Sequence, residues 1–305
     1  MIEQADKAGA TILIKGHVPY PDALNRFDDA PIALFAKGHI SLCNKPSIGI
    51  VGARNASINA VNLTASWAQQ LGEAGFIITS GIARGIDRAA HIGALPTGTI
   101  GISGCGIDII YPTENTDLYE KIAEQGLILT EMVPGTKPSP HAFPARNRII
   151  ASLTRAIIVS EAAQKSGSLI TAREMADRGG EVMAIPGAPY DDRAAGCNQL
   201  IKEGAHLIQS VTDILEIMQS PIKEALPLHP TIHNQDLSHL DDKIVRDMTD
   251  EIMKNVTFTP VDIDELTRRC HVSAQLIQVA LLELELSGLV IRLSGNRVCK
   301  HLEIK

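Results

Sequence analysis

Cysteine is scarce in this sequence, and basic residues are not in excess. The 305 residues include five cysteines, an odd number without a C-x-x-C pair. That pattern argues against a disulfide framework or a zinc site and favours a reducing, cytoplasmic compartment. The formal net charge is −7, so the chain lacks a general basic coat for nucleic acid. Any site for a polyanion must therefore be a local patch.

Long apolar runs are missing as well. No run approaches the roughly 20 residues that cross a bilayer, and the opening residues M-I-E-Q-A-D-K lack the basic and then apolar pattern of a signal peptide. We therefore expect no membrane partner. Hydrophobic residues nevertheless make up 45% of the chain, which is enough for a core. The length suits one large and one small domain.

The clearest local pattern runs from Ser47 to Asp87 and consists of two successive strand–turn–helix units. In the first unit an apolar run ends at Gly52 and is followed by Arg54, and Ser57 is a candidate N-cap. Two such units imply parallel strands whose carboxyl ends meet at one crevice, where free N–H groups and helix N-termini favour anions. We expect a phosphate-bearing ligand there. The second turn contains Ser80, Gly81, Arg84 and Gly85.

The first turn is not a dinucleotide fingerprint. A G-x-G-x-x-G pattern counted from Gly52 would need glycine where the chain has Arg54 and Ser57. An arginine at this place suits phosphate oxygens, because its charge is permanent and its planar fork matches them. Considered singly, Arg54 is better explained as a surface residue on an ordinary loop. Arg84 in the second turn favours the phosphate site.

A proline-rich loop leads into a basic helix start. Pro144 suits the first turn of a helix, so Arg146 and Arg148 should lie near the positive end of the helix dipole, where cations need an anion. Both arginines are therefore candidates for contacts with the anionic ligand. The alternative is that they pair with carboxylates such as Glu131 or Glu161, and for Arg148 this alternative has nearly equal weight.

Two further groups belong to the same argument. Phe143, one of five phenylalanines, could stack on a base, at ~1–3 kcal/mol per stacked base, or make a buried staple contact. Lys165, Ser166, Gly167 and Ser168 form a third small-residue turn before a helix. Hydroxyl and backbone N–H groups there could bind phosphate oxygens without base preference, although a routine helix cap has the same sequence.

The rest of the chain completes an alternating pattern. Further strands are expected at Thr11–Lys15, Ile32–Lys37, Thr99–Ser103, Leu127–Glu131, Ala156–Val159, Glu181–Ile185 and Ala205–Ile208. The predicted organisation is an entry segment (1–46), an α/β domain (47–218), a proline-containing linker (219–241) and a small domain (242–305).

The small domain reads as three helices followed by a hairpin, which is the order of a winged helix. In such modules the third helix often reads DNA in the major groove. Here that helix, Ala274–Leu286, contains no lysine or arginine but has Glu283 and Glu285. We therefore favour protein contacts for this domain over reading of a DNA sequence.

Taken together, the motifs closely resemble the DNA-processing protein A family, DprA/Smf. The resemblance covers Tyr20 to Met218 and keeps the motif order of the family. It rests on G-I-V-G-A-R, T-S-G-I-A-R-G-I-D-R-A-A-H, G-C-G-I-D-I-I-Y-P, F-P-A-R-N-R-I-I-A-S-L, K-S-G-S-L-I-T-A, A-I-P-G and G-C-N-Q-L-I-K-E-G-A.

The resemblance implies an extended Rossmann-like, doubly wound, mostly parallel sheet with a small C-terminal winged-helix domain. It also implies sequence-independent binding of single-stranded DNA and a role in loading the RecA recombinase during natural transformation. The resemblance establishes neither a cofactor nor catalytic turnover, and we expect none. The DNA pocket of the family corresponds to Arg54, to the Ser80-Gly81 turn with Arg84, and to Phe143 and Arg146. A homodimer is implied through Gly196–Gly204.

The chain departs from the family pattern at two notable places. Thr113 stands where some members have lysine, so one phosphate contact is missing or is supplied by Lys137. Gly180 stands where many have arginine, a difference we take as structural. Many members also begin with a helical domain that this sequence does not have.

An enzyme is the competing hypothesis. A nucleotide phosphoribohydrolase of the lysine-decarboxylase-like type has a related fold, but it carries a P-G-G-x-G-T-x-x-E motif. The nearest string here, A-I-P-G-A-P-Y, lacks the glutamate. An NAD-dependent enzyme is disfavoured by the missing fingerprint.

Overall fold

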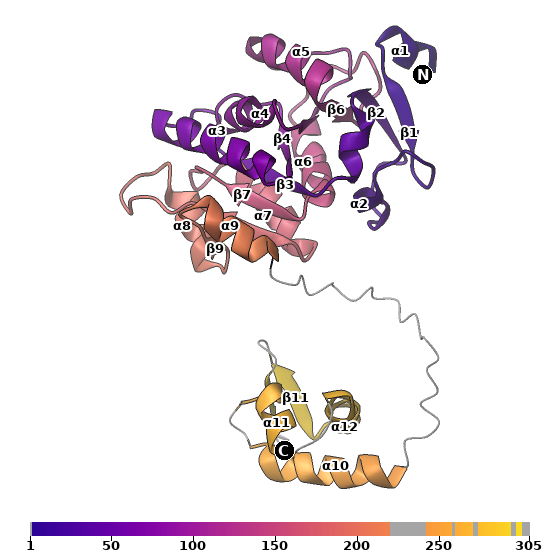
Figure 1. Cartoon of the computed structure of the whole chain (residues 1–305), viewed down its shortest axis with the longest axis vertical. Helices are drawn as coiled ribbons and strands as arrows, with labels where there is room; N and C mark the ends of the chain where they lie inside the picture. Colours follow the sequence, from indigo (N-terminus) through magenta and orange to yellow (C-terminus); the bar gives the residue numbers. More distant parts are fainter. Residues whose placement is uncertain (1, 220–241, 258–259, 271–273, 294–296, 301–305) are drawn as a thin grey trace. The chain divides into compact units, whose positions relative to one another are not determined.

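The structure is a computed structural model in which residues 2–219, 242–257, 260–270, 274–293 and 297–300 are described (Figure 1). The chain divides into two compact units, residues 1–226 and 227–305. The expected linker lies outside the described residues from residue 220 onward. None of the described helices is both long and apolar enough to cross a membrane.

The first unit is built on one sheet with the strand order β1-β2-β6-β5-β4-β3-β7-β8-β9. β2 runs antiparallel to both of its neighbours, and the other neighbouring strands are parallel. The expected strands are all present, with ends that differ by no more than two residues. They are β1 (Thr11–Ile14), β2 (Ala33–Gly38), β3 (Ser47–Val51), β4 (Ile77–Gly81), β5 (Thr99–Ile102), β6 (Leu127–Thr130), β7 (Ala156–Val159), β8 (Glu181–Ala184) and β9 (His206–Leu207).

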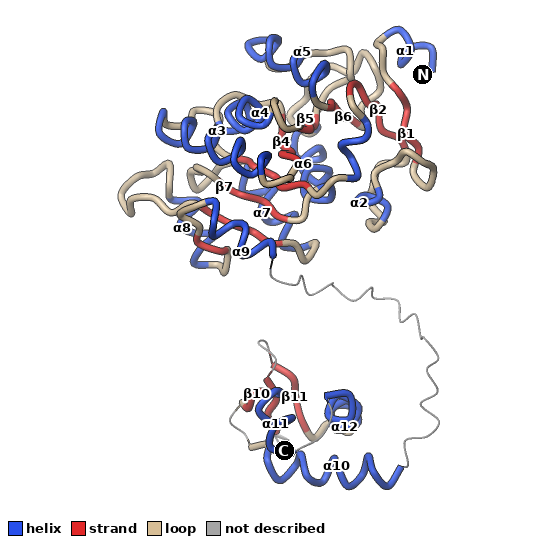
Figure 2. The backbone as a smooth tube through the Cα atoms, in the orientation of Figure 1, coloured by secondary structure: helices blue, strands red, loops and turns tan. Residues whose placement is uncertain are grey.

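Helices cover both faces of this sheet, which makes the unit doubly wound (Figure 2). The described helices of this unit are α1 (Ile2–Lys7), α2 (Asp22–Asn25), α3 (Ile58–Glu73), α4 (Ile86–Ala94), α5 (Thr116–Gln125), α6 (Ala142–Leu153), α7 (Ser168–Asp177), α8 (Ala195–Lys202) and α9 (Val211–Gln219). The unit also contains two short 3-10 turns, η1 (Ile40–Asn44) between β2 and β3 and η2 (Thr113–Asn115) before α5. Ser57 caps α3 as expected, because its Oγ accepts a hydrogen bond of 3.1 Å from Ala60 N.

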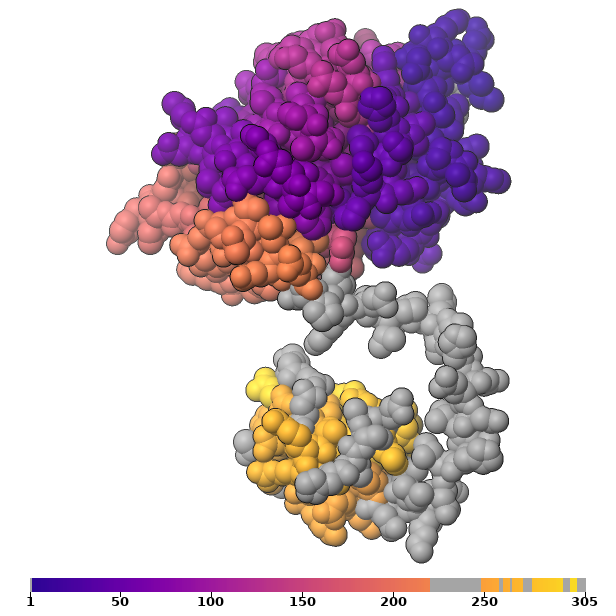
Figure 3. All heavy atoms as spheres, in the orientation of Figure 1, coloured from indigo at the N-terminus to yellow at the C-terminus, as the bar shows by residue number. Residues whose placement is uncertain are grey.

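The central strands are buried on both faces, as their continuous apolar runs predict. Every residue of β3 and β7 is buried. On one face α3, α4 and α9 pack on these strands through Trp67, Ile86 and Ile214, respectively. α9 lies beside α3 on the surface (Figure 3).

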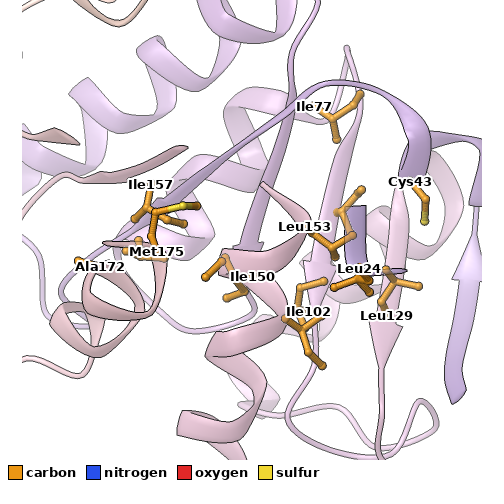
Figure 4. Close-up of a cluster of buried hydrophobic side chains, with 14 of the residues drawn as sticks. Leu24, Cys43, Ile77, Ile102, Leu129, Ile150, Leu153, Ile157, Ala172 and Met175 are labelled. Atoms are coloured by element: carbon orange, nitrogen blue, oxygen red, sulfur yellow. The ribbon is translucent and has the colours of Figure 1, made fainter. Parts of the chain in front are cut away.

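The other face of the sheet is covered mainly by α6 and α7. Figure 4 shows Ile150 of α6 and Met175 of α7 among strand residues such as Ile157. Apolar layers on both faces bury the sheet and fix the positions of the loops that leave its carboxyl edge.

The first 46 residues extend the sheet as well as packing on it. Within them β1 pairs with β2, and β2 pairs with β6. Tyr20 is 2% exposed, and its hydroxyl donates a 2.6 Å hydrogen bond to Pro31 O. The entry segment is therefore part of the first compact unit.

The second unit is a winged helix. Its described elements are α10 (Asp242–Asn255), β10 (Val261–Asp262), α11 (Ile263–Cys270), α12 (Ala274–Leu286), β11 (Val290–Leu293) and β12 (Arg297–Lys300). The three strands are ordered β10-β12-β11, and the core includes Ile252, Leu266, Ile277 and Leu281. The expected turn of the hairpin, 294–296, lies outside the described residues.

The order in which successive strands are added across the sheet changes direction between β3 and β7. From β3 the strands β4, β5 and β6 follow on one side, and β7 then returns to the other side of β3. Ligands bind at such a switch point in open α/β sheets. Backbone hydrogen bonds join the loops there, from Ala53 N to Glu161 O at 2.7 Å and from Ile86 N to Ala53 O at 3.2 Å.

Gly85 allows this close approach. It has φ +71° and ψ −121°, which only glycine adopts readily, and a Cβ at this position would overlap Ala53 O. The second predicted turn therefore packs directly against the first.

We expect Gly85→Ala to lower the free energy of unfolding of the first unit by at least ~3 kcal/mol, because backbone strain and steric overlap add. The matched control is Gly179→Ala, with φ +72° and nothing within 4 Å of an added Cβ, for which strain alone predicts about 1 kcal/mol. Urea unfolding can be followed by the fluorescence of Trp67, the one tryptophan of the chain. Equal losses in the two variants would contradict the close packing of the turns.

Candidate nucleic-acid interface

A cleft opens at the carboxyl edge of the sheet, beside the switch between β3 and β7. It comprises a larger cavity of about 580 Å³ and a smaller one of about 300 Å³. Five residues line both cavities: Arg54, Ala83, Tyr111, Phe143 and Arg146. The larger cavity also reaches Gly52, Ser166, Gly167 and Ser168, and the smaller one reaches Arg84 and Thr113.

Eight of the thirteen predicted site residues thus meet in this cleft. They are Gly52, Arg54, Arg84, Phe143, Arg146, Ser166, Gly167 and Ser168. The three turns that the sequence placed at separate strand ends converge because those strands are parallel and adjacent.

An aromatic pair and an arginine form the part of the cleft shared by both cavities. The guanidinium carbon of Arg54 lies 5.6 Å from the centre of the Phe143 ring, a cation–π distance. The Tyr111 ring lies 5.6 Å from Phe143 with an interplanar angle of 32°. Phe143 is half-buried and Tyr111 is exposed. Apolar ring surface and positive charge are therefore offered side by side, which suits both the bases and the phosphates of a single strand.

Arg146 forms the floor of the cleft. Its side chain is almost fully buried, and Nη1 donates a 2.7 Å hydrogen bond to Ile102 O. Its Nε has no hydrogen-bond partner among the described residues. Burial lowers the pKa of the guanidinium, an effect opposed by the nearby Asp87 carboxylate.

Gly81 makes room for this buried charge. A Cβ on Gly81 would overlap both Arg146 Nη1 and Asp87 Oδ2. Burial raises the pKa of Asp87, and the attraction of Arg146 partly offsets that rise. The glycine predicted to lie in a phosphate turn thus lies at the end of β4 between two charged side chains.

Ser80 is directed into the interior. Its side chain is fully buried, and Oγ donates a 2.6 Å hydrogen bond to Ile50 O. This bond ties β4 to β3, and Ser80 is absent from the residues that line the cleft. Gly85 likewise lies outside that lining, in contact with Ala53.

Two predicted basic residues lie outside the cleft lining. Arg148 pairs through Nη2 with Glu131 and donates from Nη1 to Asp29 O at 2.7 Å, which is the carboxylate alternative left open by the sequence. Lys165 is exposed beside the third turn. In that turn the hydroxyls of Ser166 and Ser168 lie 2.7 Å apart.

Sequence reasoning missed several residues of the cleft. Tyr111, Asn147 and Thr171 line it but were not selected as site residues, and neither was Glu114. The Y-P pair after the third strand of the main domain was a signal for Tyr111, because it follows a strand that ends at the same edge. The distance between Tyr111 and Phe143 depends on the path of the loop that carries Tyr111, which the spacing of residues in the sequence does not give.

A buried histidine holds the backbone of Gly81, next to Arg146. His91 is fully buried, with Nε2 2.7 Å from Gly81 O and Nδ1 2.7 Å from Thr99 Oγ1. Burial lowers the pKa of His91 to about 4. The ring is therefore neutral at pH 7 and donates from Nε2 to Gly81 O, an atom that only accepts.

This pKa predicts a loss of stability in acid. The folded pKa lies below the unfolded value of ~6.5, so the unfolded state binds the proton first and the contribution of His91 is complete above about pH 6.5. It falls by ~3 kcal/mol as pH decreases to about 4. Asp87, with its raised pKa, acts in the opposite sense. We expect His91→Gln to flatten the pH dependence of urea unfolding between pH 6.5 and 4, and unchanged slopes would contradict a neutral buried ring.

Comparison with known proteins agrees with the resemblance seen in the motifs. Residues 11–219 match the sequence profile of DNA recombination-mediator protein A, and residues 242–296 match that of the DprA winged helix domain. DNA processing protein DprA of Streptococcus pneumoniae is 44% identical over 198 residues, which cover 64% of this chain and 70% of that protein. Protein Smf of Synechocystis is 32% identical, covering 97% and 81%.

Two solved structures share the fold. The X-ray structure of DNA processing protein A from Streptococcus pneumoniae superposes with a TM-score of 0.65 at 41% identity, covering 68% of this chain and 74% of that one. The structure of DNA processing protein A from Helicobacter pylori, described for its single-stranded DNA binding mode, superposes with a TM-score of 0.64 at 31% identity, covering 68% and 95%.

Proposed function

Because the chain belongs to the DNA recombination-mediator protein A family, we propose that it binds single-stranded DNA in the cleft at the β3–β7 switch, without sequence preference in its backbone contacts. The observation that carries this proposal is the meeting of Arg54, Arg84 and Arg146 with Phe143 and Tyr111 in one cleft. The relative from Helicobacter pylori, described for single-stranded DNA binding, supports it.

In this proposal, different residues of the cleft contact the phosphates and the bases. Arg54 and Arg84 contact phosphates at the surface, and the N-terminus of α7 with Ser166 and Ser168 offers hydroxyl and N–H donors to another phosphate. Phe143 and Tyr111 stack on a base. Arg146 adds positive potential at the base of the cleft, because it belongs to the lining and its nearly buried charge is weakly screened. Lys165 extends the phosphate path beyond the cleft.

We further propose that the protein is a binding module and not an enzyme, and that it passes its strand to the RecA recombinase in the cytoplasm. The family description as a recombination mediator supports this role. In a cell that takes up DNA, the bound strand would be incoming DNA during natural transformation. No cofactor is needed for such a transfer.

A homodimer through Gly196–Gly204 is part of the proposal. In this segment Gly196 and Cys197 face inward, whereas Gln199 and Lys202 are exposed. The adjacent strand β9 ends the sheet and exposes Leu207 to 49%. None of the residues 196–204 lines the cleft at the β3–β7 switch.

Arg54→Ala should weaken binding to a fluorescent oligothymidine and reduce the slope of log affinity against log salt by ~0.7, because one phosphate contact is lost. The control is Arg155→Ala, which removes an exposed arginine at the amino end of β7, away from the cleft. We expect that control to retain the wild-type slope. Absence of single-strand binding by the wild type, or equal preference for duplex, would reject the proposed function and favour a test of nucleotide hydrolysis.

Phe143→Ala should weaken the same complex by ~1–3 kcal/mol without changing the salt slope, because stacking involves no counterion release. Tyr190→Ala is the matched control, since it removes a fully exposed aromatic ring outside the cleft. The quantity to compare is the dissociation constant at several salt concentrations. A changed slope in Phe143→Ala would exclude a pure stacking role.

A further inference from the structure

The smaller cavity contains a carboxylate that phosphate binding does not explain. This cavity of about 300 Å³ is lined by Glu114 together with Arg84, Tyr111 and Thr113. A carboxylate repels phosphodiester oxygens, so Glu114 weakens a site whose only task is to hold a backbone. Its place in the lining calls for a ligand that donates hydrogen bonds.

Glu114 is held on a firmly anchored turn. The next residue, Asn115, is 1% exposed, and its Nδ2 donates a 3.0 Å hydrogen bond to Ile82 O. Arg88 Nη1 donates to Asn115 Oδ1 at 3.1 Å, and the same guanidinium pairs with Asp117. The turn that carries Glu114 is thereby fixed to the loop that carries Arg84, and preorganised groups are better suited to recognise a ligand.

Arg84 and Glu114 offer complementary groups at the same place. Nη1 of Arg84 lies 3.9 Å from Oε1 of Glu114, and the two side chains are 53% and 62% exposed. A surface pair at this distance contributes little to stability, so both groups can turn to a ligand. A planar acceptor of two hydrogen bonds thus lies beside a planar donor.

Guanine is the base that satisfies both groups. Its N1–H and N2–H₂ are adjacent donors that match the two oxygens of a carboxylate, and its O6 accepts from arginine. Adenine and cytosine each present one exocyclic amino group to a carboxylate. Thymine presents one N–H between two carbonyl oxygens, which a carboxylate repels.

We propose that the smaller cavity is a base subsite selective for guanine, in which Glu114 accepts from N1–H and N2–H₂ and Arg84 donates to O6 from Nη1, the nitrogen that faces Glu114. The other donors of the Arg84 guanidinium stay available to a phosphate. Tyr111 supplies ring surface beside the base. The subsite rests on the proposed function, because it reads one base of a strand otherwise held through its phosphates. It adds a local preference to that binding.

Competition measurements test this subsite. A fluorescent oligothymidine bound to the full chain is displaced by unlabelled oligonucleotides of equal length in which every third thymine is replaced by guanine, adenine or cytosine. Lithium salts and isolated guanines prevent quadruplex formation. We expect the guanine series to compete roughly tenfold better than oligothymidine, the lower part of the range for one bidentate pair.

Two variants locate the preference. Glu114→Gln should abolish it, because an amide presents an N–H₂ group to the guanine donors, while oligothymidine binding is retained or strengthened. Glu120→Gln makes the same charge change at an exposed position of α5 outside the cleft lining and should retain the preference. These two variants separate base recognition from a general change of charge.

The outcomes are distinct. Tight binding of all four series with equal affinity overturns the guanine subsite and leaves the proposed function standing. A guanine preference that persists in Glu114→Gln overturns the assignment to Glu114. Failure of the wild type to bind any oligonucleotide overturns the proposed function, and the subsite with it.

Discussion

The cleft depends on the burial of one positive charge. Arg146 extends from α6 beneath the carboxyl end of β4, where Gly81 leaves room for it and Asp87 supplies the opposite charge. Removing a charge from water is unfavourable unless hydrogen bonds and a counter-charge compensate. Because Ile102 O and Asp87 provide that compensation from two other elements, the same group of contacts fixes the positions of α4, β5 and α6 around the cleft.

The elements of the fold could be read from the sequence because their signals are local. Buried parallel strands appear as short apolar runs, and Ser57 marks the start of α3 through its own hydroxyl. The meeting of the glycine and serine turns followed from one further rule, that adjacent parallel strands end at a common edge. What could not be read is the position of β2 in the sheet, since an antiparallel strand from the first 46 residues has the same apolar pattern as a parallel one.

The position of the candidate site could be predicted from the sequence, whereas most of its individual contacts could not. Gly52, Arg54 and Phe143 reach the cleft because each follows a strand end or begins a helix at that edge. Ser80 does not, because its rotamer turns it to Ile50 O, and side-chain direction at a strand end depends on packing that spacing does not encode. Arg148 pairs with Glu131 of the neighbouring loop. The sequence offered both Glu131 and DNA as partners, and it does not give the distance between the two side chains that decides between them.

The pairing of β3 with β7 has a consequence for how the protein is made. Ile48 lies opposite Ala156, so β7 leaves the ribosome long after its partner β3. Until then β3, β4, β5 and β6 form a partial sheet with β3 as an open edge, and such edges invite pairing with other chains. The larger cavity of the cleft, whose lining includes Ser166, Gly167 and Ser168, is therefore complete only after β7 has been synthesised.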